Sequence, residues 1–343
     1  MTSTKEIGVG VVGLGYMGRT HVTAYRDAAA DGVRTRLVAV CDANPALAGG
    51  DTSARGNLDT GRHAARLFDP RETSFHRDPA ELFALPAVDL VSICTHTRSH
   101  VELATQALEA GKHVLVEKPV ALSAAAVERL LAAARAAGRL CMPAMCVRFW
   151  PGWDWLRATV RAGTLGEVRS AVFRRIAAHP GWAPEFYRDP HENGGALFDL
   201  HVHDADFVRW CFGPPAAVTS TGTIDHLTTL YRYLRGPAHV VAEGGWDLAT
   251  GFEFVMSFTV AFAEATADYR LGRTPPLLLC RDGKAQPVAL APGNGYEGEV
   301  RHALALLTDP DAIPLAPLED AVGLTRMLEA EGESLRTGAT VAV

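Results

Sequence analysis

A glycine-rich segment near the start of the chain carries the first recognisable chemistry. Residues 13–18 read Gly-Leu-Gly-Tyr-Met-Gly and directly follow an apolar run at residues 7–12. Gly13 permits a tight turn, Gly15 lets a pyrophosphate approach the backbone, and Gly18 lets the following helix pack closely on the strand. The helix that begins here offers its N–H groups and positive dipole end to a phosphate. We therefore expect dinucleotide contacts from Gly13, Gly15, Tyr16, Met17 and Gly18, a ligand-free glycine turn being the alternative.

An acidic residue follows the next apolar run, at the position where a dinucleotide ribose would lie. Asp42 ends the segment Val-Ala-Val-Cys-Asp. A carboxylate here accepts hydrogen bonds from the adenosine ribose and repels a 2′-phosphate, which favours NAD over NADP. The alternative is a turn aspartate at a strand end. Arg55, Arg62 and Arg66 lie downstream and leave NADP open.

A lysine stands at the end of another apolar run, in Glu117-Lys118-Pro119. Ligands of a doubly wound sheet bind beyond the carboxyl ends of its strands. An ammonium group there stabilises an alkoxide as it forms, or polarises a carbonyl. Without further context a solvated surface lysine explains Lys118 as well.

The stretch at residues 194–206 is the richest in ionisable groups. If it forms one helix, Asp199, His203 and Asp206 share a face. An aspartate one turn from a histidine orients the ring and raises its basicity, which suits a base for a hydroxyl proton. A structural histidine and a metal site are the alternatives. We expect no metal, because His201 and His203 would point nearly opposite ways on a helix.

The surrounding elements predict two domains. Apolar runs alternate with helical segments over residues 1–145, which indicates an α/β, Rossmann-type, doubly wound parallel sheet. Within it, Ser99 and Ser123 are predicted helix N-caps, and much of residues 44–77 reads as a surface insertion. Residues 146–343 carry half-buried, alternating runs and three helical segments, typical of an α+β domain with an open, mainly antiparallel sheet.

Composition excludes several function classes. The 343-residue chain has a net charge of −6, which argues against nucleic-acid binding. It shows neither a secretory leader nor an apolar run of about 20 residues, so we expect no membrane segment. Six cysteines without C-x-x-C spacing fit reduced thiols in a cytoplasmic protein.

Taken together, these residues resemble the Gfo/Idh/MocA oxidoreductase family over nearly the whole chain. The resemblance rests on the glycine loop, Ile-Cys-Thr…His at 93–100, Ala-Gly-Lys-His-Val-Leu-Val-Glu-Lys-Pro at 110–119, Gly-Thr-Leu-Gly-Glu-Val at 163–168, and Gly-Gly-Ala-Leu…Asp…His at 194–203. Because the Glu-Lys-Pro and Asp-x-x-x-His motifs occur in this order, a functional role for Lys118, Asp199 and His203 is favoured over a surface lysine and a structural histidine.

The resemblance implies an NAD(P)-dependent dehydrogenase that transfers hydride to or from a secondary alcohol of a sugar, cyclitol or related polyol. Lys118, Asp199 and His203 would be catalytic. It also implies a homodimer or homotetramer formed through the C-terminal sheet. Further cofactor contacts are expected from Thr95, His96, His100 and Glu117, and substrate contacts from Arg148, Tyr187 and His191.

Three features depart from the family pattern. Thr95-His96-Thr97 replaces the common Thr-Pro, His201 stands where glycine is common, and residues 49–72 form an unusual insertion. Two other activities stay open: redox-assisted cleavage of a glycosidic bond with retained NAD, and a non-catalytic sensor that binds NAD(P).

Overall fold

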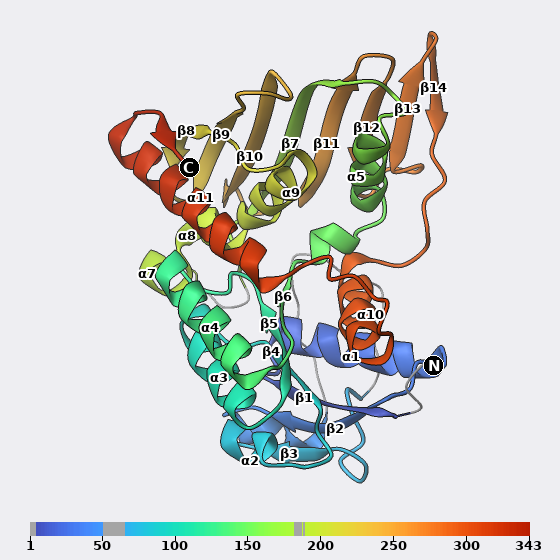
Figure 1. The fold of residues 1–343 in the computed structure, drawn as a ribbon, viewed down its shortest axis with the longest axis vertical. Helices are drawn as coiled ribbons and strands as arrows, with labels where there is room; N and C mark the ends of the chain where they lie inside the picture. Colours follow the sequence, from blue (N-terminus) through green and yellow to red (C-terminus); the bar gives the residue numbers. More distant parts are fainter. Residues whose placement is uncertain (1–4, 51–65, 182–186, 188) are drawn as a thin grey trace. The chain divides into compact units, whose positions relative to one another are not determined.

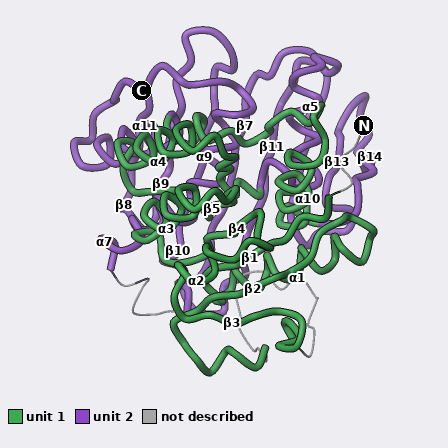
Figure 2. The backbone as a smooth tube through the Cα atoms, turned by 60° about the horizontal axis from the view of Figure 1, so that its bottom comes forward, with its two compact units in different colours: residues 1–146, 294–322 green, residues 147–293, 323–343 purple. Residues whose placement is uncertain are grey.

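The chain folds into two compact units, and each is discontinuous in sequence. A computed structural model describes residues 5–50, 66–181, 187 and 189–343. Unit 1 contains Met1–Cys146 and Asn294–Val322, and unit 2 contains Val147–Gly293 and Gly323–Val343 (Figure 2). The predicted insertion lies partly at residues 51–65, which are outside the described residues, as are Arg55 and Arg62.

Unit 1 is built on a six-stranded parallel sheet with the strand order β3-β2-β1-β4-β5-β6. The strands are β1 (Ile7–Val12), β2 (Thr35–Cys41), β3 (Ser74–His76), β4 (Leu90–Ile93), β5 (His113–Glu117) and β6 (Cys141–Ala144). Every residue of β1, β4 and β6 is buried, as expected for a sheet covered on both faces. The strand order reverses between β1 and β4, which is where such sheets bind ligands. The predicted doubly wound α/β fold is confirmed.

Helices cover both faces of this sheet (Figure 1). On one face α10 (Gly295–Thr308) packs along α1 (Tyr16–Ala30), so the C-terminal part of the chain contributes to unit 1. On the other face α3 (Thr97–Glu109) packs on α4 (Ala124–Ala137). The remaining helices are η1 (Pro45–Gly49), α2 (Pro79–Phe83) and η2 (Cys146–Phe149), the last of which bridges the unit boundary.

The local predictions for unit 1 had mixed outcomes. Ser123 caps α4 as predicted, and its side chain accepts the N–H of Ala126 at 3.4 Å. The Ser99 prediction was wrong: α3 begins earlier, and the Ser99 hydroxyl instead donates to the carbonyl of His96 at 2.8 Å. The loop expected at 44–77 also ends early, because β3 adds an edge strand beside β2.

Unit 2 contains a nine-stranded sheet ordered β14-β13-β12-β11-β7-β10-β9-β8-β15. Its strands are β7 (Val168–Ala178), β8 (Ala217–Thr223), β9 (His226–Arg232), β10 (His239–Leu248), β11 (Val255–Phe262), β12 (Thr266–Arg270), β13 (Leu277–Arg281), β14 (Lys284–Pro287) and β15 (Val341–Ala342). All pairings are antiparallel except that of β7 with β10. The predicted open, mainly antiparallel sheet is confirmed.

Four helices of unit 2 lie against one face of this sheet (Figure 1). They are α5 (Trp153–Ala162), α8 (Gly195–Asp199), α9 (Val202–Phe212) and α11 (Leu318–Thr337), which begins in unit 1. The short helix α7 (Pro190–Asn193) contacts α8. Between helices and sheet, Trp153 is fully buried against Phe173, Phe207 and Phe258. In the described parts of the chain, no helix combines the length and apolar character needed to cross a membrane.

Candidate cofactor and active site

The carboxyl ends of the parallel strands bring together most of the predicted cofactor residues of unit 1. Gly13 directly follows β1 and Asp42 directly follows β2, whereas Thr95 is the second residue after β4. Glu117 ends β5, and Lys118 comes next. Since parallel strands end at a common edge, these residues from distant parts of the sequence meet along one side of the sheet.

The three glycines of the loop differ in what a side chain at each position would contact. Gly13 has a φ of +88°, and a Cβ there would lie 2.5 Å from the carbonyl oxygen of Cys94. A Cβ on Gly18 would lie 1.7 Å from the carbonyl oxygen of Gly13. Gly15, the N-cap of α1, is different: a Cβ there would meet no atom of the described residues within 4 Å. Open space beside a helix N-terminus is what a pyrophosphate requires, so this cradle fits a dinucleotide.

Asp42 anchors the glycine loop with its carboxylate. One oxygen accepts the N–H of Leu14 at 2.7 Å, and the other accepts the N–H of Asn44 at 2.8 Å. Each carboxylate oxygen can accept a further hydrogen bond, so these contacts leave capacity for ribose hydroxyls. Asp42 therefore has a structural role beside the predicted binding role.

Arg19 is a polar group at this loop that the sequence reasoning missed. Its Nε donates to the carbonyl of Leu14 at 2.8 Å, while its buried Nη1 has no hydrogen-bond partner among the described residues. Burial lowers the pKa of Arg19, against the opposing effect of Asp42. Its position directly after the third glycine was the available signal.

His100 ties two parts of the predicted cofactor site together. Its ring is buried, with Nδ1 2.9 Å from the carbonyl oxygen of Pro119 and Nε2 3.0 Å from that of Thr95. Burial lowers the pKa of His100, so the ring is neutral at pH 7 and donates to one of the two carbonyls. The hydroxyls of Thr95 and Ser99 lie 2.7 Å apart, and the predicted contact residue His96 is the N-cap of α3. Thus His100 fixes the loop after β4 to the segment after Lys118.

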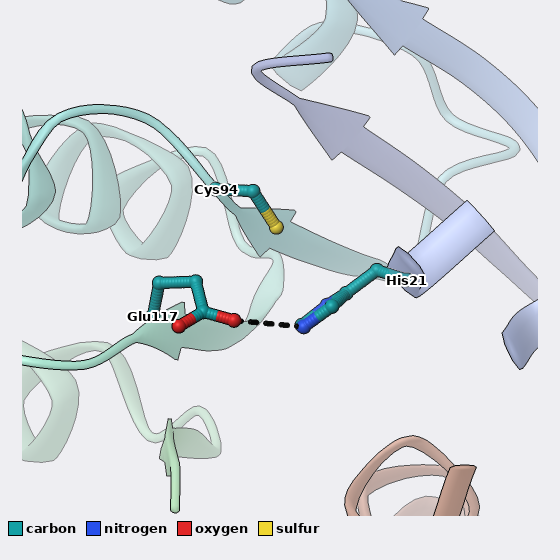
Figure 3. A group of neighbouring side chains, drawn as sticks. All are labelled: His21, Cys94 and Glu117. Carbon is teal, nitrogen blue, oxygen red and sulfur yellow. Dashed lines mark hydrogen bonds and ion pairs between the residues drawn. The ribbon is translucent and has the colours of Figure 1, made fainter. Parts of the chain in front are cut away.

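A buried ionisable cluster lies next to these elements, formed by His21, Cys94, Glu117 and Glu299. Figure 3 shows the side chains of His21, Cys94 and Glu117 pointing toward one another. The His21 Nε2 atom is 3.0 Å from Glu117 Oε1 and 3.6 Å from Glu299 Oε1. On its other side, His21 Nδ1 is 3.1 Å from the Ser92 hydroxyl, which lies 2.8 Å from that of Tyr25. Sequence reasoning missed His21 and Glu299, which sit inside helical patterns that look amphipathic.

The charges within this cluster depend on one another. Burial by itself would lower the pKa of His21, but Cys94, Glu117 and Glu299 outweigh it and raise that pKa well above 6.5. Burial raises the pKa of Glu299 to about 7; His21 opposes this shift and Glu117 adds to it. At neutral pH His21 is therefore an imidazolium beside Glu117, and Glu299 is close to its titration midpoint.

A metal ion is the other ligand that such side chains suggest. One donor atom each from His21, Cys94 and Glu117 lie within 4.8 Å of one another. However, both nitrogens of His21 lie at hydrogen-bond distance from side-chain oxygens, and burial raises the pKa of the Cys94 thiol. A metal ligand thiol must be deprotonated, so the arrangement fits a shared proton better than a cation.

In unit 2 the predicted catalytic stretch is not one helix. It breaks between α8, which ends at Asp199, and α9, which begins at Val202, so the expected common face with Asp206 was wrong. Asp206 instead accepts two hydrogen bonds from Arg148, at 2.8 and 2.6 Å, and both residues are buried. The predicted substrate residue Arg148 is thus engaged in a buried ion pair.

The other ionisable residues of this stretch divide into two groups. Asp204 pairs with Arg175 at 2.7 Å, and His201 Nε2 lies 2.8 Å from Glu331 Oε2; all four are buried. Asp199 and His203, in contrast, are partly exposed. Within residues 199–206, they are the ionisable side chains that reach the surface of unit 2.

The remaining predicted substrate residues lie near α7 and α8. Tyr187 packs against the cluster of Ala196, Leu200 and Trp246, with ring centroids of Tyr187 and Trp246 5.2 Å apart. His191 is exposed in the first turn of α7, where its N–H donates to Asp189 at 2.9 Å. These contacts give Tyr187 a packing role and leave the His191 ring at the surface.

Comparison with known proteins identifies both parts of the chain. Residues 7–145 match the model described as the oxidoreductase family with an NAD-binding Rossmann fold, GFO_IDH_MocA. Residues 153–272 match the GFO/IDH/MocA C-terminal domain. The two matches follow each other in the order that the strand patterns predicted.

Two curated relatives and one solved structure illustrate the similarity. Inositol 2-dehydrogenase 1 of Saccharopolyspora erythraea is 34% identical over 205 residues, which are 59% of this chain and 53% of that protein. Trans-1,2-dihydrobenzene-1,2-diol dehydrogenase of Bos taurus is 32% identical over 227 residues, 63% of this chain and 65% of that protein. The matches thus span about half to two thirds of these relatives. Aldose-aldose oxidoreductase of Caulobacter crescentus, solved with glycerol, has a TM-score of 0.81 at 21% identity and covers 99% and 100% of the two chains, which shows the common fold.

Proposed function

The chain belongs to the Gfo/Idh/MocA oxidoreductase family, and we propose that it is a dehydrogenase that oxidises or forms a secondary alcohol of a sugar, cyclitol or related polyol. The observation that carries this proposal is the edge of the parallel sheet. The open cradle at Gly15, the carboxylate of Asp42 and Lys118 all follow strands that end at this edge. The names of the two curated relatives, an inositol dehydrogenase and a dihydrodiol dehydrogenase, support the same class of substrate.

Different residues of the chain bind different parts of the cofactor. The N–H groups at the start of α1 hold the pyrophosphate, and Asp42 accepts hydrogen bonds from the adenosine ribose, so NAD is preferred over NADP. Thr95, His96 and His100 shape the loop beside the nicotinamide. The bound nicotinamide supplies the hydride chemistry.

Three residues act on the alcohol in this proposal. His203, oriented by Asp199, takes the hydroxyl proton as the alcohol is oxidised and returns it in the reverse direction. The ammonium of Lys118 stabilises the substrate oxygen as negative charge develops. The partial exposure of Asp199 and His203, beside buried and ion-paired neighbours, is what supports their role.

The test is NADH absorbance over time, with NAD or NADP offered together with inositols, aldoses and sugar acids. We expect one of these classes to reduce NAD. Lys118→Ala should lower turnover about 100-fold or more while the Kd for NADH stays near the wild-type value, because the lysine acts on developing charge. Lys284→Ala, which alters an exposed lysine of β14, is the matched control.

Other results would redirect the proposal. Reduction of NADP alone would contradict the role of Asp42. Full turnover in Lys118→Ala would contradict the role of that lysine. NADH binding without turnover on any alcohol would contradict the dehydrogenase proposal and favour redox-assisted bond cleavage or a ligand sensor.

We further propose that the protein forms a homodimer or homotetramer through the uncovered face of the unit 2 sheet and works in the cytoplasm. The paired residues Leu230, Val241 and Val172 form an apolar row across three neighbouring strands, and Val172 is 42% exposed. None of the six cysteines forms a disulfide, as is typical of proteins in a reducing compartment.

A further inference from the structure

A chain of contacts within unit 1 leads from helix α10 to the backbone of Lys118. Glu299 on α10 lies 3.6 Å from the His21 ring, and the same ring nitrogen lies 3.0 Å from Glu117 Oε1. The other oxygen of Glu117 accepts the backbone N–H of Lys118 at 3.1 Å. A residue 181 positions downstream of Lys118 thus reaches it through two side chains.

This chain of contacts is costly to bury. The side chains of His21 and Glu299 are fully buried, and that of Glu117 is 6% exposed. Neither oxygen of Glu299 has a hydrogen-bond partner in the described part of the chain. Apolar side chains of similar volume would usually be at least as stable as such a cluster. Packing alone therefore gives no reason to place these groups here.

The His21 ring is held so that one nitrogen faces Glu117. The Ser92 hydroxyl, itself bonded to Tyr25, fixes the opposite side of the ring. The thiol of Cys94, the residue after β4, completes the polar surroundings, and Tyr296 of α10 is partly buried nearby. A ring fixed from both sides gives Glu117 a single well-defined partner.

We infer that His21 and Glu299 are positioning residues for Lys118: together they fix the Glu117 carboxylate, which holds the peptide from which the Lys118 side chain extends. This inference rests on the proposed function, in which Lys118 stabilises the substrate oxygen. The imidazolium of His21 neutralises Glu117, so the carboxylate stays buried and keeps its bond to the Lys118 N–H. Without that positive charge, Glu117 and Glu299 would repel each other, and the peptide of Lys118 would lose its constraint.

The experiment compares His21→Leu, His21→Gln and Glu299→Gln with the wild type. Gln at position 21 retains an N–H donor for Glu117, whereas Leu does not. The first readout is the rate at which acetic anhydride modifies Lys118, measured by mass spectrometry with and without NADH, which needs no substrate. The second is kcat and KM between pH 6 and 8, and unfolding temperature checks that each variant is folded.

We expect NADH to protect Lys118 from acetylation in the wild type, and we expect His21→Leu to reduce this protection about threefold or more. His21→Gln should reduce the protection to a smaller extent, because it keeps the hydrogen bond to Glu117 but not the positive charge. In His21→Leu, kcat should fall about 10-fold or more with little change in KM, as for a lost transition-state interaction. The ratio of wild-type to Glu299→Gln kcat should change about threefold between pH 6 and 8, because Gln mimics only the protonated carboxyl.

Wild-type protection and kcat in folded His21→Leu would overturn the inference, and so would a ratio for Glu299→Gln that stays constant with pH. If His21→Leu does not fold, His21→Gln and Glu299→Gln still decide the matter. Lys118→Ala separates the two claims: if that variant keeps full turnover, the proposed function fails, while the acetylation readout still tests the positioning.

Discussion

At the scale of single residues, the fate of an ionisable side chain depends on partners that are remote in sequence. Within residues 199–206, spacing alone placed Asp206 with Asp199 and His203. In the structure Asp206 pairs with Arg148, and Asp204 with Arg175. These pairs are separated by 58 and 29 residues, so no helical spacing rule contains them. The sequence could identify the stretch that is rich in ionisable side chains. It could not show which of these side chains are buried by contacts with remote parts of the chain.

The buried pair of Arg148 and Asp206 should be sensitive to loss of one partner. Asp206→Ala leaves an uncompensated buried guanidinium, so we expect a loss of about 3–5 kcal/mol in the free energy of unfolding. Urea unfolding followed by fluorescence measures it. Glu333→Ala, which removes an exposed partner of Arg336, is the control and should cost at most about 1 kcal/mol. Equal losses in the free energy of unfolding for the two variants would contradict the expected difference between the buried and the exposed ion pair.

Glu299 should make the protein less stable as pH rises. Its pKa is raised from 4.5 to about 7 by burial, so between these values the folded state binds more protons than the unfolded state. Stability therefore falls from about pH 4.5 to about pH 7 through this group. Glu299→Gln removes this contribution, so its unfolding temperature should gain a few degrees relative to the wild type between pH 5 and 8. Parallel curves for the two proteins would show that Glu299 does not titrate in this range.

At the scale of elements, burial decided which strands the sequence could reveal. The central strands of unit 1 are continuous apolar runs, and β1 was predicted with its observed bounds. The strand patterns in the sequence did not indicate β3, β9, β12, β14 or β15. Of these, β9, β12 and β14 contain many polar residues, and every residue of β14 is exposed. Such strands are ordered by their neighbours in the sheet rather than by their own apolar residues.

The loop that opens α1 yields a prediction from paired glycine variants. Gly18→Ala brings a Cβ to 1.7 Å from the Gly13 carbonyl oxygen, so the strand and helix must separate and stability should fall. Gly15→Ala meets no described atom within 4 Å, and its φ of −67° suits alanine. We therefore expect Gly15→Ala to unfold at the wild-type temperature but to bind NADH about 10-fold or more weakly, because its methyl group would occupy the pyrophosphate cradle. Calorimetry measures the unfolding temperature of each variant, and fluorescence titration measures its affinity for NADH. Unchanged NADH affinity in Gly15→Ala would contradict the proposed position of the pyrophosphate at Gly15.

At the scale of the whole molecule, the uncovered face of the unit 2 sheet is the surface on which the proposed assembly depends. Its row of Leu230, Val241 and Val172 continues into Thr259 and Asp268. Val172→Arg should reduce the molar mass measured by light scattering to that of one chain, because a charge would be buried without a partner. Leu234→Arg, at a residue that is 91% exposed after β9, should leave the mass unchanged. A wild-type chain that is already monomeric would refute the proposed assembly.

The discontinuity of the two units has a consequence for synthesis on the ribosome. Translation proceeds from the N-terminus, so the sheet of unit 1 emerges long before α10, which begins at Gly295. Until then His21 and Glu117 lack the helix that buries them, and unit 2 likewise waits for its last segment, residues 323–343. Chains truncated before residue 294 should therefore be captured by chaperones and cleaved by proteases in the α1 region, while addition of α10 should confer protection.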